Sequence, residues 1–424
     1  MDNLQKDLWN AMDQCRGSME VTHLIELFTY IAFIAKEAPD TFQTIVNSGL
    51  AKQLDMLVEA GKALEGQHPK EVCAAPEQYR VDPKIVGVAI AFVAEVSEFS
   101  LLAKALRDYT KGLGKFKGEM SSNLNMERIF TSLVGDCSNK SLYDGACGLA
   151  RVTSSLNPEV LYLEEKNHST WITAYRLLTL EDKNFQMNKS DSLLESAFGY
   201  KPQFDLAVME PPMSLKFSAD ARRMLAGSPF IKVPTGSAVS ATSGDSLWIQ
   251  LALSNLNDKG KAYILLPQGL LFRGGYDAKV REYLLENELI EAIIGLPASL
   301  LDFTGIPTVL LVLSKNKPAG SPVIFVDASE IGTSNKHATE ISNADAKLIA
   351  DLAAGKLPDD ERFRAVFIPE IRDQNNELNI SRYIIKNITV EEIDIAQELK
   401  ILQSCKSDFE QSQQKLTSLL INFH

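Results

Sequence analysis

Residues 207–213 read AVMEPPM and complete an apolar run that begins at Phe204. Proline cannot donate a hydrogen bond to a sheet and fixes its own φ angle, so two prolines directly after a strand form a tight turn. Chains use such a turn where backbone carbonyls must point into a site. Glu210 precedes the two prolines and Met213 follows them. The stretch is a candidate catalytic turn, the remains of one, or a tight corner without chemistry.

A second candidate stretch, YDGACGLARV at residues 143–152, follows another short apolar run. In a doubly wound sheet, ligands bind at the carboxyl ends of the strands, and small residues there let the backbone approach a ligand. Such a strand end is provided by Asp144, Gly145, Ala146 and Gly148. The pattern alone fits an ordinary strand-to-helix turn equally well.

Acidic residues farther along the chain add to the case for a ligand. Glu164 and Glu165 end the next predicted strand, and Glu165 lies 21 positions after Asp144. An acidic residue about 20 positions after such a turn commonly meets ribose hydroxyls. A nucleoside-containing cofactor is therefore as good an explanation as a solvated acidic corner. Asp191, in KSDSLLES, stands where it could hold an adenine amino group or cap a helix N-terminus.

The elements that must position these residues follow from the apolar pattern. From Leu142 onward, short apolar runs alternate with helical stretches, which predicts an α/β fold with a mostly parallel sheet covered on both faces. The predicted strands are SLYD, VLYLEE, FDLAVM, KAYILLP, LIEAIIGLP, TVLLVLSK and PVIFVDAS. Each candidate site residue up to Met213 then lies at or just beyond the carboxyl end of a strand or in the loop that follows it.

Helical periodicity occupies both ends of the chain. Apolar residues recur at helical spacing over residues 1–109, and a stretch rich in Gly, Lys and Ser at residues 110–123 marks a boundary or an exposed loop. The tail has an apolar stripe suited to a partner helix, with Ile393, Leu399, Leu402, Leu416, Leu419 and Leu420. We therefore expect an N-terminal helical domain at 1–116, an α/β domain at 117–387 and a C-terminal helical tail at 388–424.

Composition excludes several classes of protein. With 424 residues, 45% hydrophobic and 23% charged, the chain is typical of a soluble globular protein. The N-terminus lacks the apolar core of a signal peptide, and no window approaches the ~18 apolar residues of a membrane span. Five cysteines and five histidines form no metal-binding pattern, which argues against a zinc site and for a reduced, cytoplasmic location.

The formal net charge is −12, and the sequence contains no long block of Lys and Arg. A protein that grips DNA through its phosphates needs a basic face. The isolated chain is therefore expected to be a poor general DNA binder, and duplex DNA would be bound only within a complex.

The chain resembles the modification subunit of type I restriction–modification systems. The resemblance extends from about Gly118 to Tyr383 and is most specific at residues 260–315, GKAYILLPQGLLFRGGYDAKVREYLLENELIEAIIGLPASLLDFTGIPTVLLVLSK. SGDSLWIQLALSNL and LNISRY, the latter at residues 378–383, fit as well. The resemblance implies a DNA adenine-N6 methyltransferase with the Rossmann-like, doubly wound class I S-adenosylmethionine-dependent fold. It also implies a cytoplasmic defence complex with a specificity subunit and a restriction subunit.

The family's cofactor loop usually reads Asp-Pro-Ala-Cys-Gly-Ser-Gly-Gly, and this chain matches it only in part. Asp144, Ala146, Cys147 and Gly148 match, whereas the other positions hold Gly145, Leu149, Ala150 and Arg151. By the same resemblance, Glu165 stands for the acidic ribose contact and Asp191 for the residue that contacts adenine. Side chains where the family has glycine should hinder the cofactor, so S-adenosylmethionine binding is expected to be weak or lost. The family's lid sequence is also altered, to GEMSSN at residues 118–123.

The turn at Glu210, Pro211, Pro212 and Met213 stands where the family has Asn-Pro-Pro-Phe or Asn-Pro-Pro-Tyr. In the family, the Asn oxygen and a proline carbonyl accept hydrogen bonds from the N6 amine of a flipped-out adenine, and the aromatic ring stacks on the base. Glu210 accepts but cannot donate and is one methylene longer than Asn. Met213 has no aromatic face. The prediction is a modification-type subunit with impaired catalysis.

Three readings remain open on the sequence alone. The first is an active DNA methyltransferase that tolerates altered motifs. The second is a catalytically inactive, methyltransferase-fold subunit with a structural or regulatory role in a DNA defence complex. The third, methylation of a protein glutamine or a small molecule, meets the same difficulty at Glu210 and Met213.

Overall fold

The computed structural model describes residues 2–15, 17–76, 82–109, 123–213, 215–233, 244–301, 305–335, 338–385 and 395–421. The chain divides into two compact units, Met1–Ile384 and Ile385–His424. The predicted domain boundaries at 116/117 and 387/388 lie outside the described residues and stay predictions.

Helices form the N-terminal part of the first unit. They are α1 (Asp2–Gln14), α2 (Val21–Glu37), α3 (Pro39–Val46), α4 (Leu50–Leu64), α5 (Lys70–Cys73), α6 (Pro83–Ala94) and α7 (Phe99–Tyr109). The apolar residues that predict α2, Leu24, Leu27, Phe28 and Ile31, are all buried in the core. Pro83 starts α6, where a missing N–H costs nothing, and the Asp82 side chain accepts from the Lys84 N–H to cap it.

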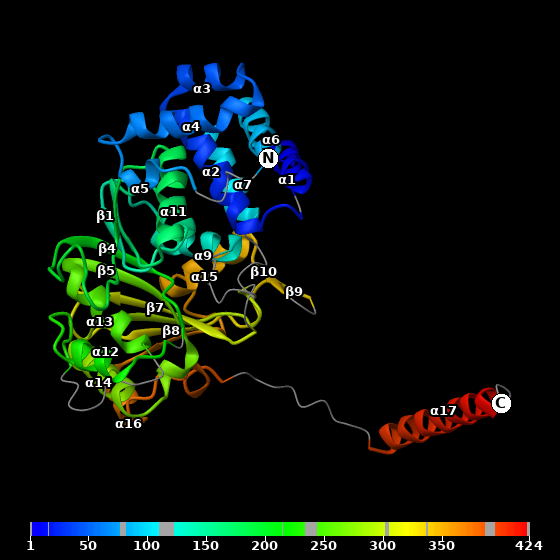
Figure 1. Ribbon diagram of the computed structural model, residues 1–424. Coiled ribbons are helices and arrows are strands. Elements are labelled where there is room, and N and C mark those ends of the chain that lie inside the picture. Colours follow the sequence, from blue (N-terminus) through cyan, green and yellow to red (C-terminus); the bar gives the residue numbers. More distant parts are fainter. Residues whose placement is uncertain are drawn as a thin grey trace. The chain divides into compact units, whose positions relative to one another are not determined.

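A β-sheet forms the centre of the unit (Figure 1). It has nine strands in the order β11-β8-β6-β7-β5-β4-β1-β2-β3. The strands are β1 (Ser141–Asp144), β2 (Val160–Glu165), β3 (Phe185–Lys189), β4 (Phe204–Met209), β5 (Leu256–Pro267), β6 (Ile290–Gly295), β7 (Thr308–Ser314), β8 (Val323–Asp327) and β11 (Phe363–Val366). A separate two-stranded sheet pairs β9 (Thr333–Ser334) with β10 (Thr339–Glu340).

The pairing of β3, β2, β1, β4 and β5 is parallel throughout, and β6 is parallel to β8. β7 runs antiparallel to both of its neighbours, β5 and β6, and β11 is antiparallel to β8. The parallel half contains the candidate site residues, because the carboxyl ends of parallel strands meet at one edge of the sheet.

Both faces of the sheet are covered, because side chains alternate along each strand. On β5, Tyr263 and Leu265 belong to the core shared with the N-terminal helices, whereas Ala262, Ile264 and Leu266 belong to the opposite core. The first core includes α9 (Leu124–Val134), α10 (Arg151–Ser155), α11 (His168–Leu180) and α15 (Asn343–Ala353). The second includes α12 (Ala219–Ala226), α13 (Asp245–Asn255), α14 (Tyr276–Glu286) and α16 (Ile368–Asp373), with the 3₁₀ turns η2 (Gln268–Leu271) and η3 (Ile380–Arg382).

The N-terminal helices pack on α11, which lies beside α2 (Figure 1). Arg176 of α11 is buried and donates through Nε and Nη2 to the Val72 carbonyl, at 3.0 and 2.8 Å. Its guanidinium lies 4.8 Å from the ring centroid of Tyr30. From α2, Lys36 Nζ donates to the Leu180 carbonyl at 3.1 Å. These contacts fix the position of α2 against the sheet domain.

Apart from Ile385, the described part of the second unit is a single long helix, α17 (Ile395–Ile421). Its side chains from 397 to 420 are exposed, including Leu399, Leu402, Phe409, Leu416, Leu419 and Leu420. Ile393 of the predicted stripe lies outside the described residues. A search of the described helices finds none with the length and apolarity needed to cross a bilayer.

Candidate functional site

A cavity of about 640 Å³ lies at the carboxyl ends of β1, β2 and β4. Its volume is within the range of pockets that hold a cofactor-sized ligand. Seven of the sequence-predicted site residues line it, namely Asp144, Ala146, Gly148, Glu165, Asp191, Glu210 and Pro212. Residues from three strand ends and the loops after them therefore converge on one space, as expected for a doubly wound sheet.

The loop after β1, residues 144–151, is called the β1 loop below. A larger residue in place of Gly145 would force the buried Tyr143 side chain to shift, because a Cβ at this position would lie 2.6 Å from the Tyr143 hydroxyl. Gly148 and Ala150 both have left-handed backbones, with φ of 54°. Gly148 adopts this conformation without strain, whereas Ala150 carries a cost of about 1 kcal/mol. The loop thus has a backbone that needs support from its surroundings.

The two neighbouring glutamates of β2 point to different environments. Glu164 is fully buried and accepts hydrogen bonds from the Tyr143 and Ser196 hydroxyls to Oε2 and from the Ser190 hydroxyl and the Ala197 N–H to Oε1. Glu165 instead lines the cavity, and its Oε2 accepts from the Gly148 N–H at 3.0 Å. Glu164 is structural, and Glu165 both faces the cavity and supports the β1 loop.

Asp191 follows β3 and lines the cavity beside Ser192. A turn rather than a helix follows it in the described chain, so the helix-capping alternative is wrong. Lys166 Nζ donates to Asp191 Oδ2 at 2.6 Å, but the lysine side chain is 74% exposed and the pair contributes little energy. The Ser192 hydroxyl donates to the Gly145 carbonyl, which connects this turn to the β1 loop.

The turn after β4 is divided between the cavity and the core. Glu210 and Pro212 line the cavity, whereas Pro211 is buried. Met213 packs against the core that includes the N-terminal helices, and it is missing from the described residues that line the cavity. The structure thus brings together Glu210 and the predicted cofactor-contacting residues but places Met213 to one side.

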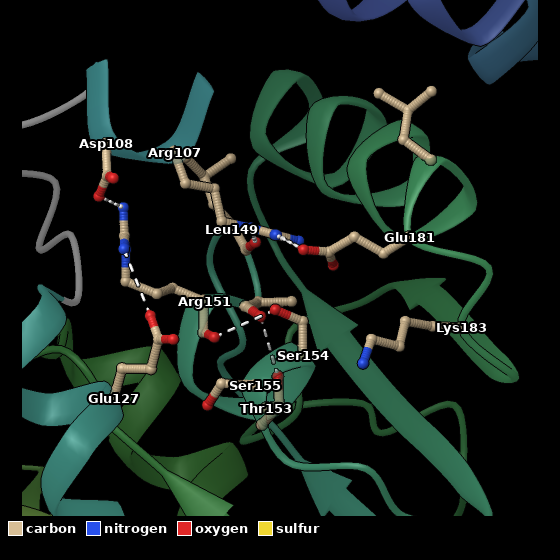
Figure 2. A network of polar contacts seen from close by, with 12 residues as sticks. Arg107, Asp108, Glu127, Leu149, Arg151, Thr153, Ser154, Ser155, Glu181 and Lys183 are labelled. Carbon is tan, nitrogen blue, oxygen red and sulfur yellow. Dashed lines mark hydrogen bonds and ion pairs between the residues drawn. The ribbon is translucent and has the colours of Figure 1, made fainter. Parts of the chain in front are cut away.

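The side chains that occupy positions 149–151 leave the cavity open. The Arg151 guanidinium donates from Nη2 to Asp108 Oδ1 at 2.8 Å and from Nη1 to Glu127 Oε2 at 3.5 Å (Figure 2). The Leu149 carbonyl accepts from Arg107 Nε at 2.8 Å. Leu149 and Arg151 border the cavity, and the 640 Å³ remain with both side chains in place. The described side chains at these positions therefore do not obstruct the cavity, whereas residues 118–122 of the altered lid lie outside the described residues.

The electrostatic character of the cavity is acidic around the β1 loop. Burial raises the pKa of Asp144 well above its ordinary value, and the nearby carboxylates of Glu210, Glu165 and Glu164 raise it further, against the Ala146 N–H, which lowers it. Burial also raises the pKa of the Cys147 thiol, with Asp144 and Glu165 adding to the effect. Cys147 is thus a protonated thiol and no nucleophile.

We expect Asp144→Asn to raise the melting temperature of the ligand-free protein at pH 7. A carboxyl whose folded-state pKa is raised contributes stability that is fully present below the unfolded pKa, near 4, and is lost as pH rises through the folded pKa. Asparagine stays neutral and can still accept from the Ala146 N–H. Thermal unfolding of both proteins from pH 4 to pH 8 should show a difference that grows with pH.

The exposed variant Asp220→Asn, at a side chain that is 84% exposed, provides the control. A melting temperature for Asp144→Asn that is below that of the parent at pH 7 would contradict the assignment of a raised pKa.

Several cavity residues were missed by sequence reasoning. Trp248 and Phe217 line the cavity, as do Thr22, Ile25 and Glu26 of α2. Trp248 lies in the SGDSLWIQ stretch, where it could have been recognised as the aromatic residue nearest to the start of a helix. The α2 residues carry no local signal, because only tertiary packing brings them to the sheet edge.

Comparisons with known proteins identify the family. The family model for N-6 DNA Methylase matches residues 101–392. The type I restriction enzyme MpnII methylase subunit of Mycoplasma pneumoniae is 26% identical over 308 residues, 68% of this chain and 56% of that protein. The MjaVII methylase subunit of Methanocaldococcus jannaschii is 28% identical over 310 residues, 67% of this chain and 52% of that protein. The chain therefore spans about half the length of these curated relatives.

A solved structure shares the fold. The methyltransferase subunit of a type I restriction-modification system from Streptococcus thermophilus superposes with a TM-score of 0.74 at 21% identity, over 91% of this chain and 99% of that one. The predicted class I, Rossmann-like architecture is confirmed.

Proposed function

Since the chain belongs to the N-6 DNA methylase family, we propose that it is a cofactor-binding, modification-type subunit of a type I restriction–modification complex in which its own adenine methylation is impaired. One observation carries the proposal. A single cavity brings together Asp144, Gly148, Glu165 and Asp191 with a turn that has Glu210 in place of the family's asparagine.

S-adenosylmethionine is the cofactor of this family, and the lining of the cavity fits it. When bound, it supplies a methyl group activated by a sulfonium cation. The carboxylate of Glu165 can accept from ribose hydroxyls, and that of Asp191 can accept from an adenine amino group. The glycines of the β1 loop expose backbone, and Glu165, Asp191 and Glu210 give the cavity the negative charge that a cationic ligand requires.

The turn after β4 impairs methyl transfer. An acceptor displaced by ~1 Å can cost ~100-fold in rate, and Glu210 is one methylene longer than asparagine. Base stacking on an aromatic ring contributes roughly 1–3 kcal/mol, and Met213 provides no ring. Because Met213 also packs toward the core, a flipped adenine would have neither its aromatic contact nor a well-placed acceptor at this turn.

The alternative is a catalytically inactive subunit that serves only structural or regulatory roles in a DNA defence complex. Such a subunit needs neither the acidic cavity nor the Glu165 position. Cofactor binding therefore separates the two readings.

Calorimetric titration of the full chain with S-adenosylmethionine tests the proposal. We expect one saturable site per chain with a dissociation constant in the micromolar range. A titration without heat of binding, on folded protein, would leave the purely structural reading.

The family and the exposed apolar residues of α17 both point to partner subunits. The specificity subunit and the restriction subunit of a type I system are the proposed partners, and duplex DNA is bound only in their company. Leu402, Phe409 and Leu416 recur every seven residues along α17 and are each more than half exposed. A stripe with this spacing suits packing against a helix of a specificity-type subunit.

We expect the change Leu402→Asp with Leu416→Asp to abolish co-purification with the specificity-type partner. A buried hydrophobic anchor contributes about 2 kcal/mol or more to an interface, and two introduced carboxylates add a desolvation cost. Co-expression followed by affinity capture of the full chain measures the effect. Ser404→Asp with Gln411→Asp, on the opposite face of the same helix, is the matched control. Capture of the partner by the leucine variant at the level of the control would contradict the proposal.

A further inference from the structure

Two arginines join the β1 loop to the helices that precede it. Arg107, in the last turn of α7, donates from Nε to the Leu149 carbonyl of the loop at 2.8 Å. Arg151, the last residue of the loop, donates back to Asp108, the neighbour of Arg107 on α7, at 2.8 Å (Figure 2). The contacts are reciprocal, because each element provides an arginine that binds an oxygen of the other.

Both arginines also have a second partner, which in each case is a glutamate outside the loop. Arg107 Nη1 forms an ion pair with Glu181, which follows α11, and each of these side chains is only 3% exposed. Arg151 Nη1 lies 3.5 Å from Glu127 Oε2 in the first turn of α9. Arg151 itself is 7% exposed. The loop is thus joined by charge-assisted contacts of two buried arginines to α7 and α9 directly, and through Arg107 to the end of α11.

The backbone of the β1 loop requires such contacts. Ala150 has a left-handed conformation that an alanine adopts at a cost, and such strain persists only where the surroundings over-determine it. Inside the loop, the Ala150 N–H donates to the Cys147 carbonyl at 2.7 Å and the Gly148 N–H donates to Glu165 at 3.0 Å. Leu149 and Arg151, on either side of Ala150, are the residues held by α7.

We propose that Arg151 is a positioning residue that keeps the β1 loop in its ligand-binding conformation by joining it to α7 and α9. The inference rests on the proposed function, in that the ligand is S-adenosylmethionine. The role of Arg151 leads to an unexpected prediction for its replacement by glycine. Arg151→Gly, which restores the residue of the resembled family, weakens cofactor binding in this chain instead of improving it.

The test compares the full chain with Arg151→Gly and Arg151→Lys by calorimetric titration with S-adenosylmethionine, at a temperature where all proteins are folded. If the competent loop population falls to about a tenth, the dissociation constant of Arg151→Gly rises about tenfold. Arg151→Lys keeps the charge but loses the forked guanidinium, so its dissociation constant should lie between the two. Arg223→Gly, at a 79% exposed position in α12, controls for the loss of an arginine and the gain of a glycine.

Hydrogen exchange of the loop amides supplies a readout that does not need the ligand. Four of these amides donate within the described structure, those of Ala146, Cys147, Gly148 and Ala150. In Arg151→Gly their exchange should accelerate, with that of β4 and α13 unchanged, whereas a general loss of stability would accelerate all three regions.

The outcomes are distinguishable. Equal or tighter binding by Arg151→Gly, or unchanged loop exchange, overturns the inference. If the parent chain itself binds no S-adenosylmethionine, the cofactor proposal fails, and the loop exchange alone then decides the role of Arg151.

Discussion

No methyl transfer to adenine in duplex DNA is expected from the chain as it stands, even with its partner subunits and S-adenosylmethionine supplied. The expected deficit is between ~500-fold and ~10⁴-fold, because a misplaced acceptor costs ~100-fold and a lost stacking contact costs a further ~5- to 150-fold. Incorporation of tritiated methyl groups into adenine-containing duplex DNA measures it. Robust labelling by the unmodified chain would establish an active enzyme.

The double change Glu210→Asn with Met213→Phe is expected to restore detectable labelling. On the sequence alone this change should fail, because Leu149, Ala150 and Arg151 would still obstruct the cofactor. The structure removes that objection, since the cavity is open with all three in place. Glu195→Asn with Met224→Phe makes the same replacements at exposed positions and should stay inactive. If the first pair is as inactive as the second, the defect lies elsewhere than in the turn.

Glu165→Ala is expected to raise the dissociation constant for S-adenosylmethionine roughly 100-fold or more. A hydrogen bond to a charged group contributes about 1.5–3 kcal/mol, and this carboxylate faces the cavity while also accepting from the Gly148 N–H. The substitution therefore removes a ligand contact and a support of the β1 loop together. Calorimetric titration at neutral pH measures the change.

Glu159→Ala is the matched control, because Glu159 precedes the same strand at its opposite end and is exposed. Its dissociation constant should equal that of the parent chain. An affinity for Glu165→Ala within a few-fold of the control would show that the ligand does not depend on this carboxylate.

Sequence reasoning identified the strands that have continuous apolar runs. A strand has such a run when both faces of the sheet around it are buried. Two strands were not identified, β3 (FQMNK) and β11 (FRAV). Both lie at an edge of the sheet and contain half-exposed, polar positions. The sequence also does not show that β7 runs antiparallel to its neighbours. Its seven buried residues look like those of a parallel strand, although it is antiparallel to both neighbours.

The candidate site could be predicted where strand ends define it, at Asp144, Glu165, Asp191 and Glu210. The effect of Arg151 could not be predicted, because its partners Asp108 and Glu127 are brought to it by packing across the domain. A side chain that replaces a glycine looks like an obstruction in the sequence. Only the structure shows that the guanidinium is directed to two carboxylates on neighbouring helices (Figure 2).

The adjacent glutamates of β2 also have a consequence for how the chain folds to one structure. A slip of this strand by one residue would place Glu165 where Glu164 lies and Glu164 where Leu163 lies, since the whole strand moves together and successive side chains point to opposite faces. Glu164 would leave its four hydrogen bonds and enter the buried, apolar position of Leu163. An unsatisfied buried carboxylate costs several kcal/mol. Competing registers of β2 against β1 and β3 are thereby penalised. The hydrogen bonds of Glu164, which does not line the cavity, thus determine that Glu165 does.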